Sequence, residues 1–170
     1  MRVFFAVFPN KTVQKQIAHH AETLEPICGG RKIKMPHLHL TLVFLGEVSV
    51  ERIEMLQQIM KSIPVKKFEL VLDQISYWKR NQIVSLQAKQ LPAELFALVD
   101  AIQMKLAENG FPFDQHVYKP HITLLRQAVH HVSSDLIKPI YWPVNQWSLI
   151  QSKSIPTGVE YVPLDHWRLK

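Results

Sequence analysis

The fold is decided by a stretch that occurs twice in the chain. The segment HLTLVFLG occupies residues 39–46, and its first four residues return as HITL at residues 121–124. The two histidines are 82 residues apart, close to half of the 170-residue chain. Each copy follows a proline, Pro36 or Pro120, and opens an apolar strand. The repeat predicts an internal duplication within one domain, residues 1–170, in which two interleaved lobes each place a His-x-Thr strand on a shared surface.

Side chains two positions apart lie on the same face of a β-strand. His39 and Thr41 therefore share one face, and the leucines beside them cover the other. The same alternation places His121 and Thr123 together above Ile122. Each copy thus presents an imidazole and a hydroxyl side by side on a rigid support.

The rest of the chain alternates between strand-like and helix-like segments. Strands are expected at residues 2–8, 38–45, 68–77, 82–88 and 121–125 and from 140 onward, and helices at 11–24, 49–60 and 93–108. Pro26 and the Gly29-Gly30 pair should end the first helix, and Ser49 should cap the second. Hairpin-like strand pairs between the helices favour antiparallel sheets, so the fold class is α+β.

Composition places the chain among compact globular proteins. Hydrophobic residues make up 47% and charged residues 20%, which allows a substantial core and excludes the disordered and fibrous classes. No apolar run approaches the roughly 20 residues of a membrane helix, and the apolar start is too short for a signal peptide. The single cysteine, Cys28, excludes an internal disulfide. We expect a cytoplasmic monomer.

The net positive charge favours anionic partners but does not identify one. Twenty Lys and Arg against fourteen Asp and Glu give a net charge of +6. The basic segment RKIK at residues 31–34 precedes the first motif, and Lys119 precedes the second. These residues fit either an RNA backbone contact or a solvated basic loop. The aromatic and basic run YWKR at residues 77–80 fits a single-strand contact less well than a hairpin turn.

Two imidazoles that face each other across a groove can cleave a phosphodiester. A neutral histidine takes a proton from the attacking water, and a protonated one donates to the leaving oxygen. Both forms are accessible near neutral pH, since the ordinary imidazole pKa is about 6.5. Threonine hydroxyls can donate to the phosphate oxygens. This chemistry requires no metal.

A structural role and a metal site are two alternatives to the catalytic interpretation. A single His-x-Thr strand would more often be structural, but the repeat in matching apolar surroundings favours function. His37, His39 and His121 could chelate a metal, yet no acidic residue lies near either motif. We therefore expect neither a metal nor another cofactor.

The two motifs resemble the signatures of the 2H phosphoesterases. Residues 39–46 and the segment PHITLLR at 120–126 match them, and RVFFAV at residues 2–7 fits the first strand of that superfamily. Within it, the chain resembles the bacterial and archaeal RNA 2′,3′-cyclic phosphodiesterases, also called 2′-5′ RNA ligases. The resemblance implies a bilobal α+β fold with pseudo-twofold symmetry, in which two antiparallel sheets line a central cleft and helices lie outside.

The resemblance also implies a reaction, the hydrolysis of a terminal 2′,3′-cyclic phosphate on RNA to a 2′-phosphate. His39 would be the proton donor and His121 the proton acceptor, with Thr41 and Thr123 holding the phosphate. Three alternatives stay open: hydrolysis of small cyclic nucleotides, the reverse 2′-5′ ligation, and binding of RNA ends without turnover.

Two further residues have roles by resemblance or position. Arg126 matches a phosphate-contacting arginine of the family, but regular alternation would place it on the opposite face from His121. A bulge or strand end must therefore turn it back toward the site. Phe5, in the first strand, is a candidate for stacking on the terminal base, although an apolar strand fits core packing equally well.

Overall fold

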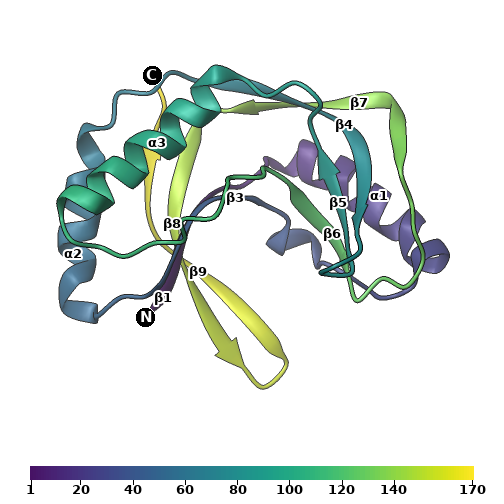
Figure 1. The fold of residues 1–170 in the computed structure, drawn as a ribbon, viewed down its shortest axis with the longest axis horizontal. Helices are drawn as coiled ribbons and strands as arrows, with labels where there is room; N and C mark the ends of the chain where they lie inside the picture. The colour runs from purple at the N-terminus through teal and green to yellow at the C-terminus, as the bar shows by residue number, and fades with distance from the viewer.

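The computed structural model describes residues 1–170, which form three α-helices, two 3₁₀ turns and nine strands (Figure 1). In chain order these are β1 (Arg2–Val7), α1 (Lys11–Cys28), β2 (Arg31–Lys32), η1 (Met35–His37), β3 (Leu40–Glu47), α2 (Val50–Ile59), η2 (Met60–Ser62), β4 (Phe68–Trp78), β5 (Ile83–Gln87), α3 (Ala93–Glu108), β6 (Ile122–Arg126), β7 (Ser134–Val144), β8 (Gln146–Ile155) and β9 (Gly158–Arg168).

The strands form two sheets, and every pairing in both is antiparallel. One sheet has the order β3-β1-β8-β9 and the other the order β2-β6-β5-β4-β7. The α+β class with two antiparallel sheets is therefore confirmed. Each sheet takes strands from both halves of the chain, and the helices cross over as well. Helix α1 follows β1 of the first sheet but packs on β6 and β7 of the second, whereas α3 packs on β3.

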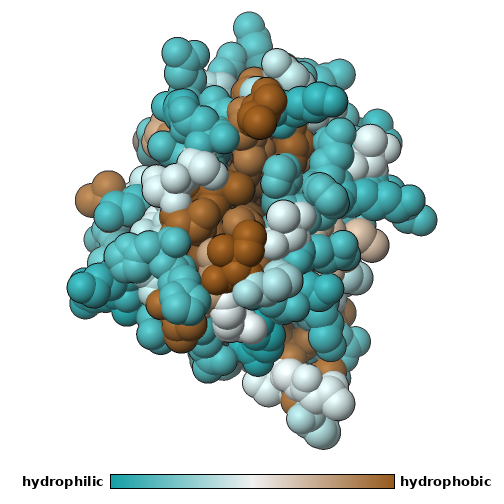
Figure 2. Space-filling model, turned by 90° about the vertical axis from the view of Figure 1, so that its right-hand side faces the viewer, coloured by the Kyte–Doolittle hydropathy of each residue, from teal (hydrophilic) through white to brown (hydrophobic).

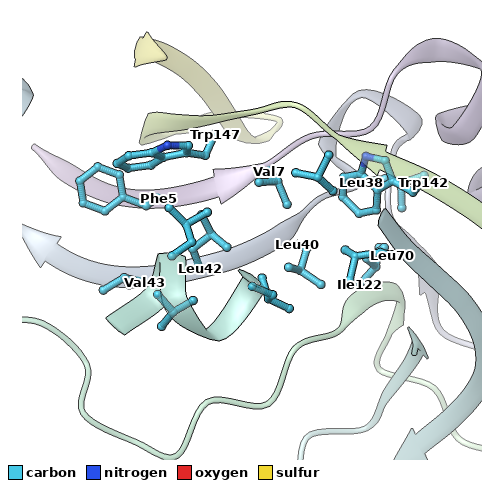
Figure 3. Close-up of a cluster of buried hydrophobic side chains, with 14 of the residues drawn as sticks. Phe5, Val7, Leu38, Leu40, Leu42, Val43, Leu70, Ile122, Trp142 and Trp147 are labelled. Atoms are coloured by element: carbon cyan, nitrogen blue, oxygen red, sulfur yellow. The ribbon is translucent and has the colours of Figure 1, made fainter. Parts of the chain in front are cut away.

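One hydrophobic core runs between the helices and both sheets. Figure 3 shows Leu40 of the first sheet beside Leu70 and Ile122 of the second, while Phe5 and Trp147 lie together farther along the first sheet. All five are almost fully buried. The inward side chains of the two sheets thus hold the sheets together along one face of each.

The first sheet has a second, smaller apolar cluster on its other face. Its buried members are Phe4, Ala6 and Ile150, and the half-buried rings of Phe8, Phe44 and Tyr161 pack around them. We call the four rings Phe4, Phe8, Phe44 and Tyr161 the aromatic floor. Strand β1 is consequently apolar on both faces, with five of its six residues buried.

The predicted helices differ from the observed ones mainly at their ends. Helix α3 has the predicted bounds. Helix α1 continues past Pro26 to Cys28, because proline removes one amide donor and leaves the neighbouring bonds intact, including Gly29 N–H to Glu25 O. The helix ends where Gly29 takes a φ of +73°. Ser49 occupies the N-cap position of α2, but its side chain makes no capping hydrogen bond.

The region after Ile140 contains more structure than its apolar pattern indicated. Strand β7 already begins at Ser134, and β8 and β9 form a long hairpin whose far end projects from the body (Figure 1). Figure 2 shows a largely hydrophilic face in which hydrophobic groups gather in one central strip. No helix in the structure has the length and apolar character needed to cross a membrane.

Candidate active site

Both motif histidines stand just before a strand and are held in the same way. The Nδ1 atom of His39 lies 2.7 Å from the carbonyl oxygen of His37, and Nδ1 of His121 lies 2.7 Å from that of Lys119. A carbonyl oxygen only accepts, so Nδ1 must carry the proton in each ring. In the neutral form, Nε2 is then the acceptor nitrogen of both imidazoles. The two histidines therefore present the same nitrogen for chemistry.

The predicted alternation around the motifs is confirmed at their first four positions. Leu40 and Leu42 are buried beside the first pair, and Ile122 is buried beside the second. Within the first motif, Nε2 of His39 lies 3.0 Å from Oγ1 of Thr41. Neutral Nε2 accepts this hydrogen bond, and a protonated ring would reverse it.

A β-bulge turns the Arg126 side chain to the face of the sheet that carries the site, as regular alternation along the strand required. In the pairing of β5 with β6, Ser85 lies opposite Thr123 and Val84 lies opposite Leu125, so Leu124 is the extra residue. The bulge places Leu124 and Leu125 both in the core and returns the next side chain to the face of Thr123. Arg126 and Thr123 accordingly line the same cavity.

The first motif carries a bulge at the matching position. In the pairing of β1 with β3, the register shifts between Thr41 and Val43, so Leu42 is extra. Phe44 then occupies the place that Arg126 holds in the second motif. Its ring stacks on Phe4 with centroids 6.4 Å apart, and the Arg2 guanidinium lies 5.0 Å from its centroid. Phe44 was not singled out from the sequence, although extending the comparison of the two motifs by two residues would have found it.

Of the two roles open to Phe5 from the sequence, core packing is the one that the structure shows. Phe5 is fully buried and packs against Trp147 and Trp167, with ring centroids 5.5 and 6.0 Å away. Its neighbour Phe4 points to the other face of β1 and lies 5.3 Å from the His39 ring. The half-buried ring of Phe44 offers the stacking surface that Phe5 lacks.

The surroundings of the two histidines differ. His39 lies in the aromatic floor, with the rings of Phe8 and Tyr161 at 5.2 and 5.4 Å. His121 packs against a single ring, that of the half-buried Trp78 at the end of β4, at 4.2 Å. The sequence favoured a hairpin turn at residues 77–80, but gave no sign that Trp78 would contact His121.

Burial and positive charge lower the pKa of both histidines. Burial is the main reason that the pKa of His39 falls to about 4, and the charges of Arg126, His121 and His37 act in the same direction. Burial, and then Arg126, also lower the pKa of His121. In each case the backbone hydrogen bond at Nδ1 opposes the change. Without a ligand, both rings are therefore neutral near pH 7.

A cavity of about 240 Å³ joins the motifs to two other segments. Its walls come from Arg31–Lys34, from the motif side chains His39, Thr123 and Arg126, from His37, and from the β8–β9 hairpin at Thr157–Val159 and Tyr161. Thr41 and His121 do not line it, but Thr41 bonds His39 and the charge of His121 acts on His39. Lys119 and the exposed His130 and His131 are also outside it.

The donors required for a metal centre are not grouped in this site. No cluster of three or more His, Cys, Asp or Glu side chains in the structure could hold a metal ion, so His37, His39 and His121 do not form a chelating set. What the residues bring together instead is two imidazoles, two hydroxyls and a guanidinium. This set can move two protons and stabilise an oxyanion.

Comparison with known proteins identifies the family. Residues 7–85 match the family model described as LigT-like phosphoesterase. An RNA 2′,3′-cyclic phosphodiesterase of Escherichia coli (strain K12) is 34% identical, over 99% of this chain and 96% of the relative. The chain belongs to the LigT-like phosphoesterase family. Another relative of this LigT-like phosphoesterase, an RNA 2′,3′-cyclic phosphodiesterase of Thermotoga maritima, is 30% identical over 95% of this chain and 91% of its own length.

Solved structures agree with the family. The E. coli LigT structure without ligand superimposes on this LigT-like phosphoesterase with a TM-score of 0.88 at 33% identity, and the match covers 99% of this chain and 96% of that one. E. coli LigT has also been crystallised with 3′-AMP, and that structure gives a TM-score of 0.87 at 33% identity over 99% and 97% of the two chains. The sequence-based assignment to the 2H phosphoesterases is thus confirmed.

Proposed function

We propose that this enzyme hydrolyses a terminal 2′,3′-cyclic phosphate on RNA to a 2′-phosphate. The observation that carries the proposal is the matched pair of histidines. Both rings are fixed through Nδ1, which leaves Nε2 for proton transfer. His39 lines one cavity with Thr123 and Arg126, and the charge of His121 acts on His39. Cleavage of a phosphodiester by water uses a general base and a general acid, and two imidazoles can supply both.

In the proposed reaction, His121 accepts a proton from water as the water oxygen attacks phosphorus. The bond between phosphorus and O3′ breaks, and His39 donates its proton to O3′ to give the free hydroxyl. Thr41 and Thr123 donate hydrogen bonds to the phosphate, and Arg126 stabilises the charge on its oxygens. The phosphate stays on O2′, and exchange with solvent then removes the proton from His121 and returns one to His39.

The low pKa of His39 makes its proton depend on the substrate. A donor must be protonated, yet burial and the nearby positive charges keep His39 neutral in the empty site at pH 7. A cyclic phosphate diester carries one negative charge, which offsets the Arg126 charge and favours the imidazolium form. Substrate binding and proton uptake are therefore coupled in this proposal.

The relatives support the choice of substrate. Curated proteins of E. coli, Archaeoglobus fulgidus, Thermotoga maritima and Thermus thermophilus carry the name RNA 2′,3′-cyclic phosphodiesterase. The same family framework has been crystallised with 3′-AMP in E. coli LigT. We further propose that the enzyme acts as a cytoplasmic monomer without a metal or other cofactor, and that its two motifs arose by duplication.

The deciding experiment is hydrolysis of a short RNA that ends in a 2′,3′-cyclic phosphate, in the presence of EDTA. A product whose phosphate resists enzymes specific for 3′-phosphates would identify a 2′-phosphate. His39→Ala and His121→Ala should each lower kcat by about 10²–10⁴-fold, as expected for loss of a general acid or base. Binding that persists in both variants without turnover in the unaltered enzyme would instead indicate an RNA-end-binding protein.

The alternative functions would give different products in the same assay. Hydrolysis confined to nucleoside cyclic phosphates would indicate a small-molecule phosphodiesterase. Joining of the cyclic end to a 5′-hydroxyl RNA would indicate 2′-5′ ligation. A dependence on added divalent metal would contradict the two-histidine mechanism.

A further inference from the structure

Two arginines lie directly opposite each other beside the catalytic histidines. In the short pairing of β2 with β6, Arg31 and Arg126 are register partners, so their side chains leave the sheet on the same face. Both line the cavity that contains His39 and Thr123. From the sequence, residues 31–34 fitted either an RNA backbone contact or a solvated basic loop.

Gly30 and the backbone hydrogen bonds of the next residues hold Arg31 in this position. Gly30 has a φ of +83°, and a Cβ at that residue would lie 2.3 Å from the carbonyl oxygen of Arg126. Only glycine lets β2 approach β6 so closely. Next along the segment, Lys32 N–H donates to the Glu25 carboxylate at 2.7 Å, and Ile33 N–H donates to Leu124 O at 2.9 Å.

Nothing in the protein neutralises this pair. Neither arginine forms a salt bridge, and no Asp or Glu lines the cavity, whereas Lys32 and Lys34 do. Like charges directly opposite on two strands destabilise a sheet. A purely structural role would not favour two facing arginines, so the arrangement calls for an anionic ligand between or beside them.

The two guanidinium groups are not equivalent with respect to the reacting atoms. The charge of Arg126 acts on both histidines, whereas that of Arg31 acts on neither. We therefore assign Arg126 to the reacting phosphate and Arg31 to a neighbouring position in the same cavity. The β8–β9 hairpin, at Thr157–Val159, lines the same cavity. The cavity therefore reaches past the motif side chains to Arg31 and the hairpin.

We propose that Arg31 binds the phosphodiester that precedes the terminal nucleotide, so that the enzyme prefers an RNA chain to a nucleoside cyclic phosphate. This inference rests on the proposed function. A nucleotide that ends in a 2′,3′-cyclic phosphate can continue only through its 5′ oxygen, so the next anion along the chain is that 5′ phosphodiester. Arg126 binds the reacting phosphate, and Arg31 binds the 5′ phosphodiester next to it.

The test compares two substrates with the same terminal base, a trinucleotide 2′,3′-cyclic phosphate and the nucleoside 2′,3′-cyclic monophosphate. Arg31→Gln should lower kcat/KM for the trinucleotide by about tenfold or more, the effect of losing a charged hydrogen bond, and for the mononucleotide by less than twofold. The dependence of log kcat/KM on log salt should become shallower by about 0.7 for the trinucleotide, the value for one phosphate contact on a single strand.

Two controls isolate the contact. A trinucleotide with an uncharged methylphosphonate at the last linkage should be hydrolysed equally by the unaltered enzyme and by Arg31→Gln. Arg168→Gln removes an exposed arginine from the far end of β9 and should change none of these values. Arg31→Gln should fold normally, with an unchanged or higher Tm, because a repulsive pair is removed.

The possible results separate this inference from the function on which it rests. Equal losses on both substrates would overturn the inference and place Arg31 at the reacting phosphate. No loss on either substrate would overturn it as well. If the unaltered enzyme hydrolyses neither substrate, the proposed function fails, and the inference fails with it.

Discussion

In the proposed mechanism, the surroundings of His39 set how the activity depends on pH. Its pKa is lowered to about 4 and that of His121 is also lowered from its ordinary value, so the free enzyme loses the required imidazolium at a lower pH than two exposed histidines would. Because kcat/KM reports the free enzyme, its profile should be a bell with a maximum between about pH 4 and 6.5.

The profile of kcat should differ from that of kcat/KM. The bound phosphate anion raises the pKa of both imidazoles, which moves the alkaline limb of kcat to a higher pH than that of kcat/KM. Steady-state rates measured from pH 4 to 9 would show the separation. Coincident limbs, or a kcat/KM that is greatest above pH 8, would contradict the proposed protonation states.

Shortening the Phe44 side chain should change the kinetics, whereas shortening the Phe5 side chain should change the stability. Phe44→Ala removes a half-buried ring from the aromatic floor and should lower kcat/KM by about tenfold if the terminal base stacks there. Phe5→Leu alters the core beside Trp147 and Trp167 and should reduce the free energy of unfolding instead. Paired kinetic and urea-unfolding measurements check both, and unchanged kinetics in Phe44→Ala would exclude stacking on this ring.

At the scale of elements, the close approach of β2 to β6 depends on one glycine. Gly30→Ala forces a side chain into a positive φ and against the Arg126 carbonyl, and should destabilise the protein by roughly 2–3 kcal/mol. Gly46 offers a matched control, since its φ is +84° but nothing lies within 4 Å of a Cβ there. Gly46→Ala should cost only about 1 kcal/mol. Equal effects in urea unfolding would show that the contact with β6 does not matter.

The elements also show what could be predicted from the sequence. The repeated motif was enough to predict the face of each histidine, and the position of Arg126 required the bulge that the structure contains at Leu124. Phe5 could not be assigned in this way. Five of six residues in β1 are buried because one face covers the core and the other covers the aromatic floor, so the strand has no polar face to mark the site.

The pairing of Arg31 with Arg126 could not be predicted from the sequence, for another reason. Strand β2 has only two residues, which is too short for any periodic pattern, and its partner lies almost a hundred residues later. The contact of Trp78 with His121 also joins separate segments, 43 residues apart. Local periodicity predicts the face of a strand, whereas the neighbour of that strand depends on how the whole chain packs.

For the molecule as a whole, the buried neutral imidazole of His39 links stability to pH. The unfolded chain binds a proton at this residue near pH 6.5 and the folded chain only near 4, so stability is fully present above 6.5 and is lost as pH falls toward 4. The loss should be about 3 kcal/mol at pH 4. Urea unfolding at pH 7 and pH 4 measures it.

His39→Asn provides the comparison for this effect, since asparagine does not titrate. The difference in unfolding free energy between the two pH values should be smaller in this variant by about 3 kcal/mol. Carboxyl groups elsewhere contribute equally to both proteins and cancel. The same pH dependence in both proteins would mean that His39 titrates normally in the folded state.

The interleaved order of the strands has a consequence for biosynthesis. Strand β1 pairs with β3 early, but its other neighbour, β8, begins at Gln146, and Tyr161 of the aromatic floor follows later still. A chain emerging from the ribosome therefore exposes an unpaired apolar edge until nearly all of it has been made. Contacts between such distant segments are slow to form. A nascent chain stalled before β8 should accordingly be prone to aggregation and inactive, although both histidine motifs have already been synthesised.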